Sequence, residues 1–134
     1  MKSNNIPPEQ LPEPTKSELE ILYVLWEKGP CTVRAVNDEL NEQRRDVNYS
    51  STLKLMQIML EKGLLQREIN GHIHTYSPAH PRETMQAKVV HSMANLAFGG
   101  SASSLILSFL GSSDTSPEEL ARIKELIRQK EEKG

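Results

Sequence analysis

The spacing of apolar residues predicts two helices near the start of the chain. One spans residues 15–28 and the other residues 32–40, and each carries its apolar side chains three or four positions apart, on one face. Thr15 and Glu18 have the spacing of a capping box that begins the first helix, and a Gly-Pro pair ends it. The apolar positions of the two helices are Leu19, Leu22, Trp26, Val33, Val36 and Leu40.

A third helix and a hairpin follow. The third helix is predicted over Tyr49 to Lys62, because its apolar residues again share one face and Gly63 is a typical residue at a helix C-terminus. Two strand-like runs, residues 64–69 and 72–76, are separated by Asn70-Gly71, the strongest short-range hairpin signal. Three short helices followed by a hairpin are the order of a winged helix-turn-helix, a fold that binds DNA.

The helical period returns after residue 80. The first helix of this region has one apolar face, formed by Met85, Val89, Met93 and Leu96. A short apolar helix is predicted over residues 104–110. The last helix begins at Ser116, Pro117 and Glu119, and its apolar positions are Leu120, Ile123 and Ile127. Three short helices cannot bury this much apolar surface by themselves. We therefore expect residues 79–134 to pack on a second copy of the chain as a dimerisation module.

The predicted fold is mainly α with a small β-hairpin, in three parts. Residues 1–14 contain four prolines and are expected to form a flexible leader. Residues 15–78 are the winged helix-turn-helix DNA-binding domain, and residues 79–134 are the helical dimerisation domain.

Composition and charge limit the classes of function that fit the chain. A net charge of −2 over 134 residues argues against a histone-like protein that coats nucleic acid by bulk charge. The charge is uneven, because residues 1–43 carry four basic and eight acidic side chains whereas residues 44–77 carry five basic and three acidic ones. The single cysteine suits a reducing interior, and no stretch resembles a signal peptide or a membrane span. We expect a cytoplasmic protein.

The candidate DNA-binding residues lie on the third helix, before it and on the hairpin. Small hydroxyl side chains at the start of the helix let a duplex come close, its free N–H groups suit phosphate, and Lys54 can reach a guanine edge or a phosphate. The alternative is an ordinary helix start with capping hydroxyls and solvated charges. The candidates are Arg44, Arg45, Tyr49, Ser50, Ser51, Thr52, Lys54, Arg67, His72 and His74.

Metal binding and catalysis have little support. His72 and His74 are expected on one face of a strand, an arrangement that can bind a metal ion. No further potential ligand lies at a spacing typical of a metal site, so structural roles are favoured for both histidines. Cys31 stands at the start of the second predicted helix, just before Thr32, where a helix N-terminus can lower the pKa of a thiol. The favoured interpretation is a small, half-buried residue. No nucleophile elbow, glycine-rich phosphate loop or HExxH helix is present. We expect no cofactor, no metal and no enzymatic activity.

Five segments together resemble the penicillinase repressor family of bacterial transcription regulators. They are PTKSELEILYVLWEKGPCTVRAVNDEL, YSSTLKLMQIMLEKGLL, GHIHTYSP, FGGSASSLILSFL and SPEELARIKELI. The resemblance implies a homodimeric repressor whose two winged helices bind the half-sites of a pseudo-palindromic operator. By position it makes residues 49–62 the recognition helix, with Ser51, Thr52 and Lys54 in its DNA-facing turns, and residues 67–76 the wing.

Two departures concern the inducing signal. Penicillinase-type repressors are inactivated by proteolysis at an Asn-Phe bond, whereas this chain has Ser108-Phe109 there. Processing at that bond, and a membrane-anchored sensor protease as partner, therefore stay open. Copper-sensing members carry paired C-terminal cysteines, which this chain lacks after Cys31. Two other functions are alternatives. One is a winged helix that binds a protein instead of DNA. The other is a regulator that senses a small ligand, but the C-terminal region has only two aromatic residues, Phe98 and Phe109, to line a pocket.

Overall fold

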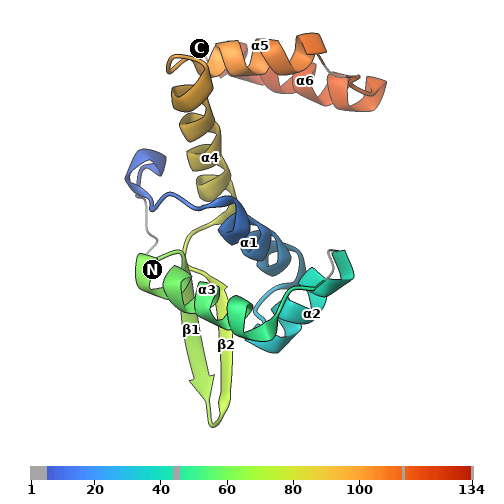
Figure 1. Cartoon of the computed structure of the whole chain (residues 1–134). Coiled ribbons are helices and arrows are strands. Elements are labelled where there is room, and N and C mark those ends of the chain that lie inside the picture. The colour runs from blue at the N-terminus through green and yellow to red at the C-terminus, as the bar shows by residue number, and fades with distance from the viewer. Residues whose placement is uncertain (1–5, 44–45, 113, 134) are drawn as a thin grey trace. The chain divides into compact units, whose positions relative to one another are not determined.

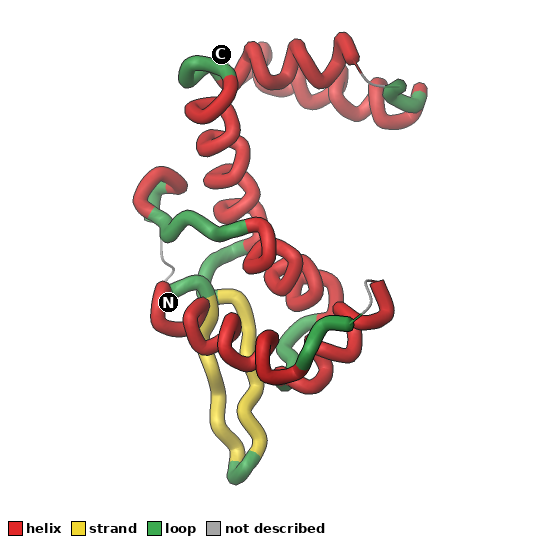
Figure 2. The backbone as a smooth tube through the Cα atoms, viewed as in Figure 1, coloured by secondary structure: helices red, strands yellow, loops and turns green. Residues whose placement is uncertain are grey.

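The computed structural model describes residues 6–43, 46–112 and 114–133 (Figure 1). Its elements in chain order are η1 (Pro8–Gln10), α1 (Lys16–Lys28), α2 (Val33–Gln43), α3 (Tyr49–Lys62), β1 (Leu65–Asn70), β2 (Ile73–Pro78), α4 (Arg82–Ala97), α5 (Ala102–Ser112) and α6 (Pro117–Lys133). The predicted fold class, mainly α with one small hairpin, is confirmed, and Figure 2 shows the two paired strands among the helices.

Local sequence signals explain where α1 begins and where α3 ends. At the start of α1, the Thr15 hydroxyl accepts from the Glu18 N–H at 3.2 Å and the Glu18 carboxylate accepts from the Thr15 N–H at 2.9 Å, which is the capping box that the sequence predicts. Gly63 ends α3 in the left-handed region with φ 86°, a conformation that favours glycine.

The hairpin turns one residue later than we expected. Asn70 pairs with Ile73 at the end of the ladder, so the two turn residues are Gly71 and His72 rather than Asn70 and Gly71. Gly71 has φ 63°, and the positive φ is confined to this first turn position, as in a type II′ turn, where glycine is preferred. The prediction of an Asn-Gly turn was wrong because glycine here begins the turn instead of ending it.

An isolated β-bridge between Cys31 and Tyr76 connects the hairpin to the helices. The Cys31 N–H donates to the Tyr76 carbonyl at 3.0 Å, and the Tyr76 N–H donates to the Cys31 carbonyl at 2.8 Å. The Tyr76 side chain is 2% exposed and belongs to the core. The base of the wing is therefore fixed to the segment that joins α1 to α2.

The core of the winged helix lies among α1, α2, α3 and the base of the hairpin. It is aliphatic and sulfur-rich, as expected for a chain with few aromatic residues. Its most buried apolar side chains are Ile21, Leu22, Leu25, Val36, Met56, Met59, Leu64 and Tyr76.

The described part of the leader is packed onto this domain, which differs from the flexible segment that we expected. Leu11 is 4% exposed and belongs to the core, directly after η1. The Glu13 carboxylate accepts from the Ser92 hydroxyl at 2.7 Å and lies 3.3 Å from the Lys88 ammonium. Prolines keep this segment extended without preventing its single leucine from inserting into the core.

The chain forms two compact units, residues 1–92 and 93–134, with the boundary inside α4. In the second unit, α5 and α6 have no buried residue among those described. Its exposed large apolar side chains are Met93, Leu96, Ile106, Leu107, Phe109, Leu120, Leu126 and Ile127. This unit on its own leaves its apolar surface in contact with solvent.

Within the described part of the chain, no single helix is long and apolar enough to cross a membrane. The bent pair of α4 and α5 meets the same criterion only when the two helices are taken together.

We expect Leu11→Ala to destabilise the winged helix by about 2–4 kcal/mol, because it leaves a cavity in a core that relaxes only in part. Urea unfolding should show a lower midpoint for this variant. Gln10→Ala, an exposed neighbour in η1, is the control and should change stability by less than about 0.5 kcal/mol. Equal midpoints for the two variants would mean that the leader does not contribute to the core.

Candidate nucleic-acid interface

The exposed face of α3 is polar and continuous. Ser50, Ser51, Lys54 and Gln57 are exposed and recur at helical spacing, whereas the opposite face is buried. Ile58, 38% exposed, adds an apolar side chain to the exposed face. Gln57 and Ile58 were not among the predicted site residues, although the same periodicity places them beside Lys54.

An asparagine caps the start of α3 and uses N–H groups that we expected to be free for phosphate. The Asn48 side-chain oxygen accepts from the Ser50 N–H at 3.0 Å and from the Ser51 N–H at 3.4 Å. It also accepts from the Ser50 hydroxyl at 2.8 Å. Since Asn48 itself accepts from these donors, the N–H groups of Ser50 and Ser51 are not free for a phosphate.

Thr52 does not belong to the exposed face. Its side chain is 2% exposed, and its hydroxyl accepts from the Asn37 amide at 2.9 Å and lies 3.4 Å from the Asn48 carbonyl, to which it donates. The prediction that Thr52 faces DNA was wrong, because it follows Ser51 by one helical step of 100° and so turns toward α2.

Two asparagines on α2 hold the segment that leads into α3. The amide groups of Asn37 and Asn41 both donate to the Val47 carbonyl at 3.0 Å. The Val47 N–H donates in turn to the Asn41 side-chain oxygen at 2.8 Å. Sequence reasoning missed this network, although Asn37 stands four residues after Val33, on the apolar side of α2, where a polar residue needs a partner.

The hairpin extends beyond the core with an exposed tip. Arg67 is exposed on β1, His72 lies in the turn and His74 is exposed on β2. Ile69 and Ile73, 52% and 58% exposed, flank the turn. His72 and His74 were expected on one strand face, but only His74 is in a strand. No cluster of three or more potential metal ligands occurs among the described residues.

A hollow of about 330 Å³ separates the start of α3 from the hairpin. It brings together three of the predicted site residues, Tyr49 from the start of α3 and His72 and His74 from the hairpin. Its other lining residues are Thr32, Val33, Leu53, Ile73 and Tyr76. Arg44 and Arg45 lie outside the described residues.

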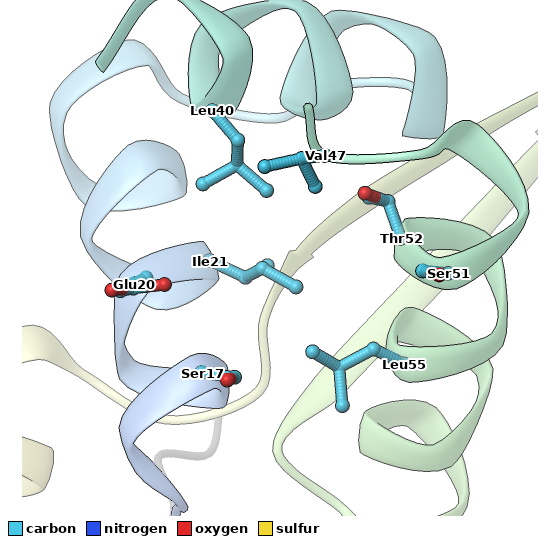
Figure 3. Close-up of a pocket in the computed structure, with 8 residues that line it drawn as sticks. All are labelled: Ser17, Glu20, Ile21, Leu40, Val47, Ser51, Thr52 and Leu55. Carbon is cyan, nitrogen blue, oxygen red and sulfur yellow. The ribbon is translucent and has the colours of Figure 1, made fainter. Parts of the chain in front are cut away.

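A second hollow lies behind the exposed face, between α1, α2 and α3 (Figure 3). It measures about 180 Å³, and the side chains of Ile21, Leu40 and Leu55 point into it, with Ser17 and Ser51 at its edge. An engineered cavity of about 150 Å³ holds one benzene ring. The hollow is therefore large enough for one small ring only.

Cys31 is half-buried and is not activated. Its thiol donates to the Gly29 carbonyl at 3.3 Å. Burial raises the pKa of the Cys31 thiol, with the nearby Lys28 acting in the opposite direction and Glu39 in the same one. The thiol therefore stays protonated at neutral pH, contrary to the lowered pKa that its position at a helix start suggested.

Three helices, the third of which has an exposed polar face, and a hairpin wing after them define a winged helix-turn-helix transcription regulator. The family model described as penicillinase repressor matches residues 14–129, and the chain belongs to this family. The match extends past the hairpin, through α4 and α5 and into α6. The family resemblance seen in the sequence is thereby confirmed.

Individual relatives are distant but extend over much of the chain. The penicillinase repressor of Bacillus licheniformis is 23% identical over 121 residues, 90% of this chain and 93% of that one. The transcriptional regulator BlaI of Mycobacterium tuberculosis is 28% identical over 95 residues, 69% of this chain and 68% of that one. The solution structure of monomeric Bacillus licheniformis BlaI in complex with the blaP half-operator has 19% identity and a TM-score of 0.48, and covers 56% of this chain and 90% of that one.

We expect Thr52→Val to destabilise the domain by about 1–3 kcal/mol, because it leaves a buried amide N–H of Asn37 without its acceptor. Thr52→Ser keeps the hydroxyl and should retain more of this stability. Chemical denaturation of both variants measures the difference. If Thr52→Val unfolded at the same midpoint as Thr52→Ser but lost DNA binding, the hydroxyl would belong to the DNA interface instead.

Proposed function

We propose that this protein is a homodimeric transcriptional repressor that binds a pseudo-palindromic operator through α3 and the hairpin wing. The observation that carries the proposal is the exposed polar face of α3, which stands beside a projecting hairpin in a member of the penicillinase repressor family. Ser50, Ser51, Lys54 and Gln57 are the side chains that we assign to the major groove. Repression then follows from occupying the promoter.

Lys54 is central to the assignment. It is exposed in the second turn of α3, and no carboxylate within the described ranges is paired with it. Its ammonium can donate to a guanine edge or to a phosphate, whereas the small hydroxyls of Ser50 and Ser51 leave room for the duplex. Contact with a base edge would make Lys54 a determinant of operator sequence.

The wing is assigned to the flanking DNA as a weak clamp. Arg67 provides one charge, and His72 and His74 add little positive charge when neutral. Ile69 and Ile73 at the tip suit contact with sugar edges more than with phosphates. Affinity must therefore depend on α3 and on the pairing of two copies.

The exposed apolar residues of the second unit support dimerisation. Leu96 is 82% exposed and Leu107 is 69% exposed, which is unfavourable for an isolated chain in water. A second copy of the same surface would cover them by two-fold symmetry. Two winged helices joined in this way present two α3 helices to two half-sites, as a pseudo-palindrome requires.

Release of the operator by proteolysis would involve the Ser108-Phe109 bond in α5. Ser108 and Phe109 lie inside this helix, where the Ser108 carbonyl accepts from the Ser112 hydroxyl at 2.7 Å and Phe109 is 50% exposed. Cleavage between them by a sensor protease would require local unwinding of α5, because a helical peptide bond must open before it can be cut.

Exposed isoleucines favour a second candidate, a winged helix that binds a protein. Ile58, Ile69 and Ile73 are all more than one-third exposed on or near the proposed DNA-facing surface. Salt dependence separates the two functions, since a DNA complex weakens steeply as ionic strength rises.

Footprinting of the wild-type protein over the DNA upstream of its own gene should reveal a protected inverted repeat. We expect Lys54→Ala to weaken binding to that repeat by about 1–3 kcal/mol if Lys54 contacts a base. Lys124→Ala on α6, an exposed lysine remote from α3 in sequence, is the control and should bind as the wild type does. Absence of any protected repeat would refute the operator function.

We expect Leu107→Glu to convert the dimer to a monomer, because an unpaired carboxylate buried in an interface costs about 3 kcal/mol or more. Sedimentation velocity should then show a dimer dissociation constant at least about a hundredfold higher. Leu96→Glu is a second test, and Gln66→Glu on the wing is the control for an added charge. A wild-type monomer, or a dimer unaffected by both leucine variants, would contradict this interface.

A further inference from the structure

An arginine outside the predicted site residues lies against the start of the recognition helix. The guanidinium carbon of Arg34, on α2, is 4.3 Å from the centroid of the Tyr49 ring, and Tyr49 is the first residue of α3. No carboxylate among the described residues is within salt-bridge distance of Arg34. Its charge is therefore held by an aromatic face instead of being neutralised.

Stacking leaves the chemistry of the guanidinium intact. A cation–π contact does not use the N–H groups as hydrogen-bond donors, and no carboxylate among the described residues is paired with Arg34, so these donors stay available to a ligand. The stack also restricts the long side chain, which lowers the conformational entropy that binding would otherwise cost. Arg34 is thus an available and partly ordered donor group for a planar or tetrahedral oxyanion.

Arg34 and Tyr49 lie at the start of α3, where two backbone N–H donors are already occupied. Asn48 already accepts from the Ser50 and Ser51 N–H groups, so the helix terminus does not by itself offer free donors at these two positions to a phosphate. Tyr49 lines the hollow of about 330 Å³ together with His72 and His74 of the hairpin. A DNA strand seated between α3 and the wing would run along this hollow, past Arg34.

We propose that Arg34, held in place by Tyr49, binds a phosphodiester oxygen of the operator backbone next to α3. The ligand is a phosphate and not a base edge, so Arg34 sets the position of α3 on the duplex and contributes equally to every DNA sequence. Tyr49 is a positioning residue that acts through Arg34. This assignment rests on the proposed function, that α3 binds an operator.

The test is operator binding at a series of salt concentrations. The probes are a duplex with the inverted repeat that the wild-type protein protects and an unrelated duplex of equal length. Arg34→Ala should weaken binding to both by the same factor, at least about tenfold, as for loss of a hydrogen bond to a charged group. The slope of log K against log salt should decrease by about 0.9 per lost phosphate contact, or about 1.8 for a dimer.

Further variants separate charge from stacking. Arg34→Lys keeps the charge but lacks the planar group, and should lose part of the affinity while retaining most of the salt slope. Tyr49→Phe keeps the ring and should retain more of the affinity than Tyr49→Ala, which removes the ring and should weaken binding. Combining Tyr49→Ala with Arg34→Ala should add little to Arg34→Ala alone. Arg122→Ala on α6, an exposed arginine, is the matched control.

The outcomes that overturn the proposal are distinct from those that overturn the function. Unchanged affinity and salt slope for Arg34→Ala, with weakened binding by Lys54→Ala, would refute the phosphate contact and leave the operator function standing. A loss confined to the operator duplex would assign Arg34 to a base edge and refute the phosphate role. Failure of the wild-type protein to prefer its protected repeat would overturn both. Circular dichroism of each variant establishes that the exposed substitutions leave the fold intact.

Discussion

The buried hydrogen bond between Asn37 and Thr52 is the contact on which the geometry of the interface depends. It joins α2 to α3 at 2.9 Å, in a region where neither side chain is more than 4% exposed. Because an unpaired amide or hydroxyl at this depth is costly, the two helices have one favoured relative position. The exposed serines and Lys54 project from the other side of the same helix, so their placement follows from this bond.

The opposite end of α3 is fixed by charge. The Lys62 ammonium lies 2.7 Å from the carboxylate of Glu18, which is 2% exposed, and it also donates to the Glu13 carbonyl at 3.1 Å. A neighbouring imidazole, that of His80, donates from Nε2 to the Gly63 carbonyl at 3.0 Å, just beyond the helix. Removing Lys62 leaves the buried Glu18 carboxylate without its counter-charge, so the pair specifies the position of α3 more than it adds to stability. With both ends held, α3 is positioned on the domain as a rigid element.

Sequence reasoning succeeded where the signal is local and failed where it depends on tertiary contacts. The Thr15 capping box and the Gly63 helix end are specified by residues three or four positions apart, and the structure contains both. Thr52 was assigned to the DNA face because a hydroxyl at the edge of an apolar stripe has no local signal for its partner, which is 15 residues away. Arg34 was missed for the same reason, since its stacking on Tyr49 joins two separate helices.

The cap of α3 and the charge beside it are physically linked. A helix start that binds phosphate through its own N–H groups must leave them free, but a helix that begins after a loop is more stable when a side chain caps it. Here Asn48 provides the cap, and the positive charge comes from α2 through Arg34. In a chain with net charge −2, such placed charges matter more than the total. In the operator complex that we propose, affinity then depends on the spacing of a few donors in two copies, which makes binding sensitive to whatever disturbs the α2–α3 contact.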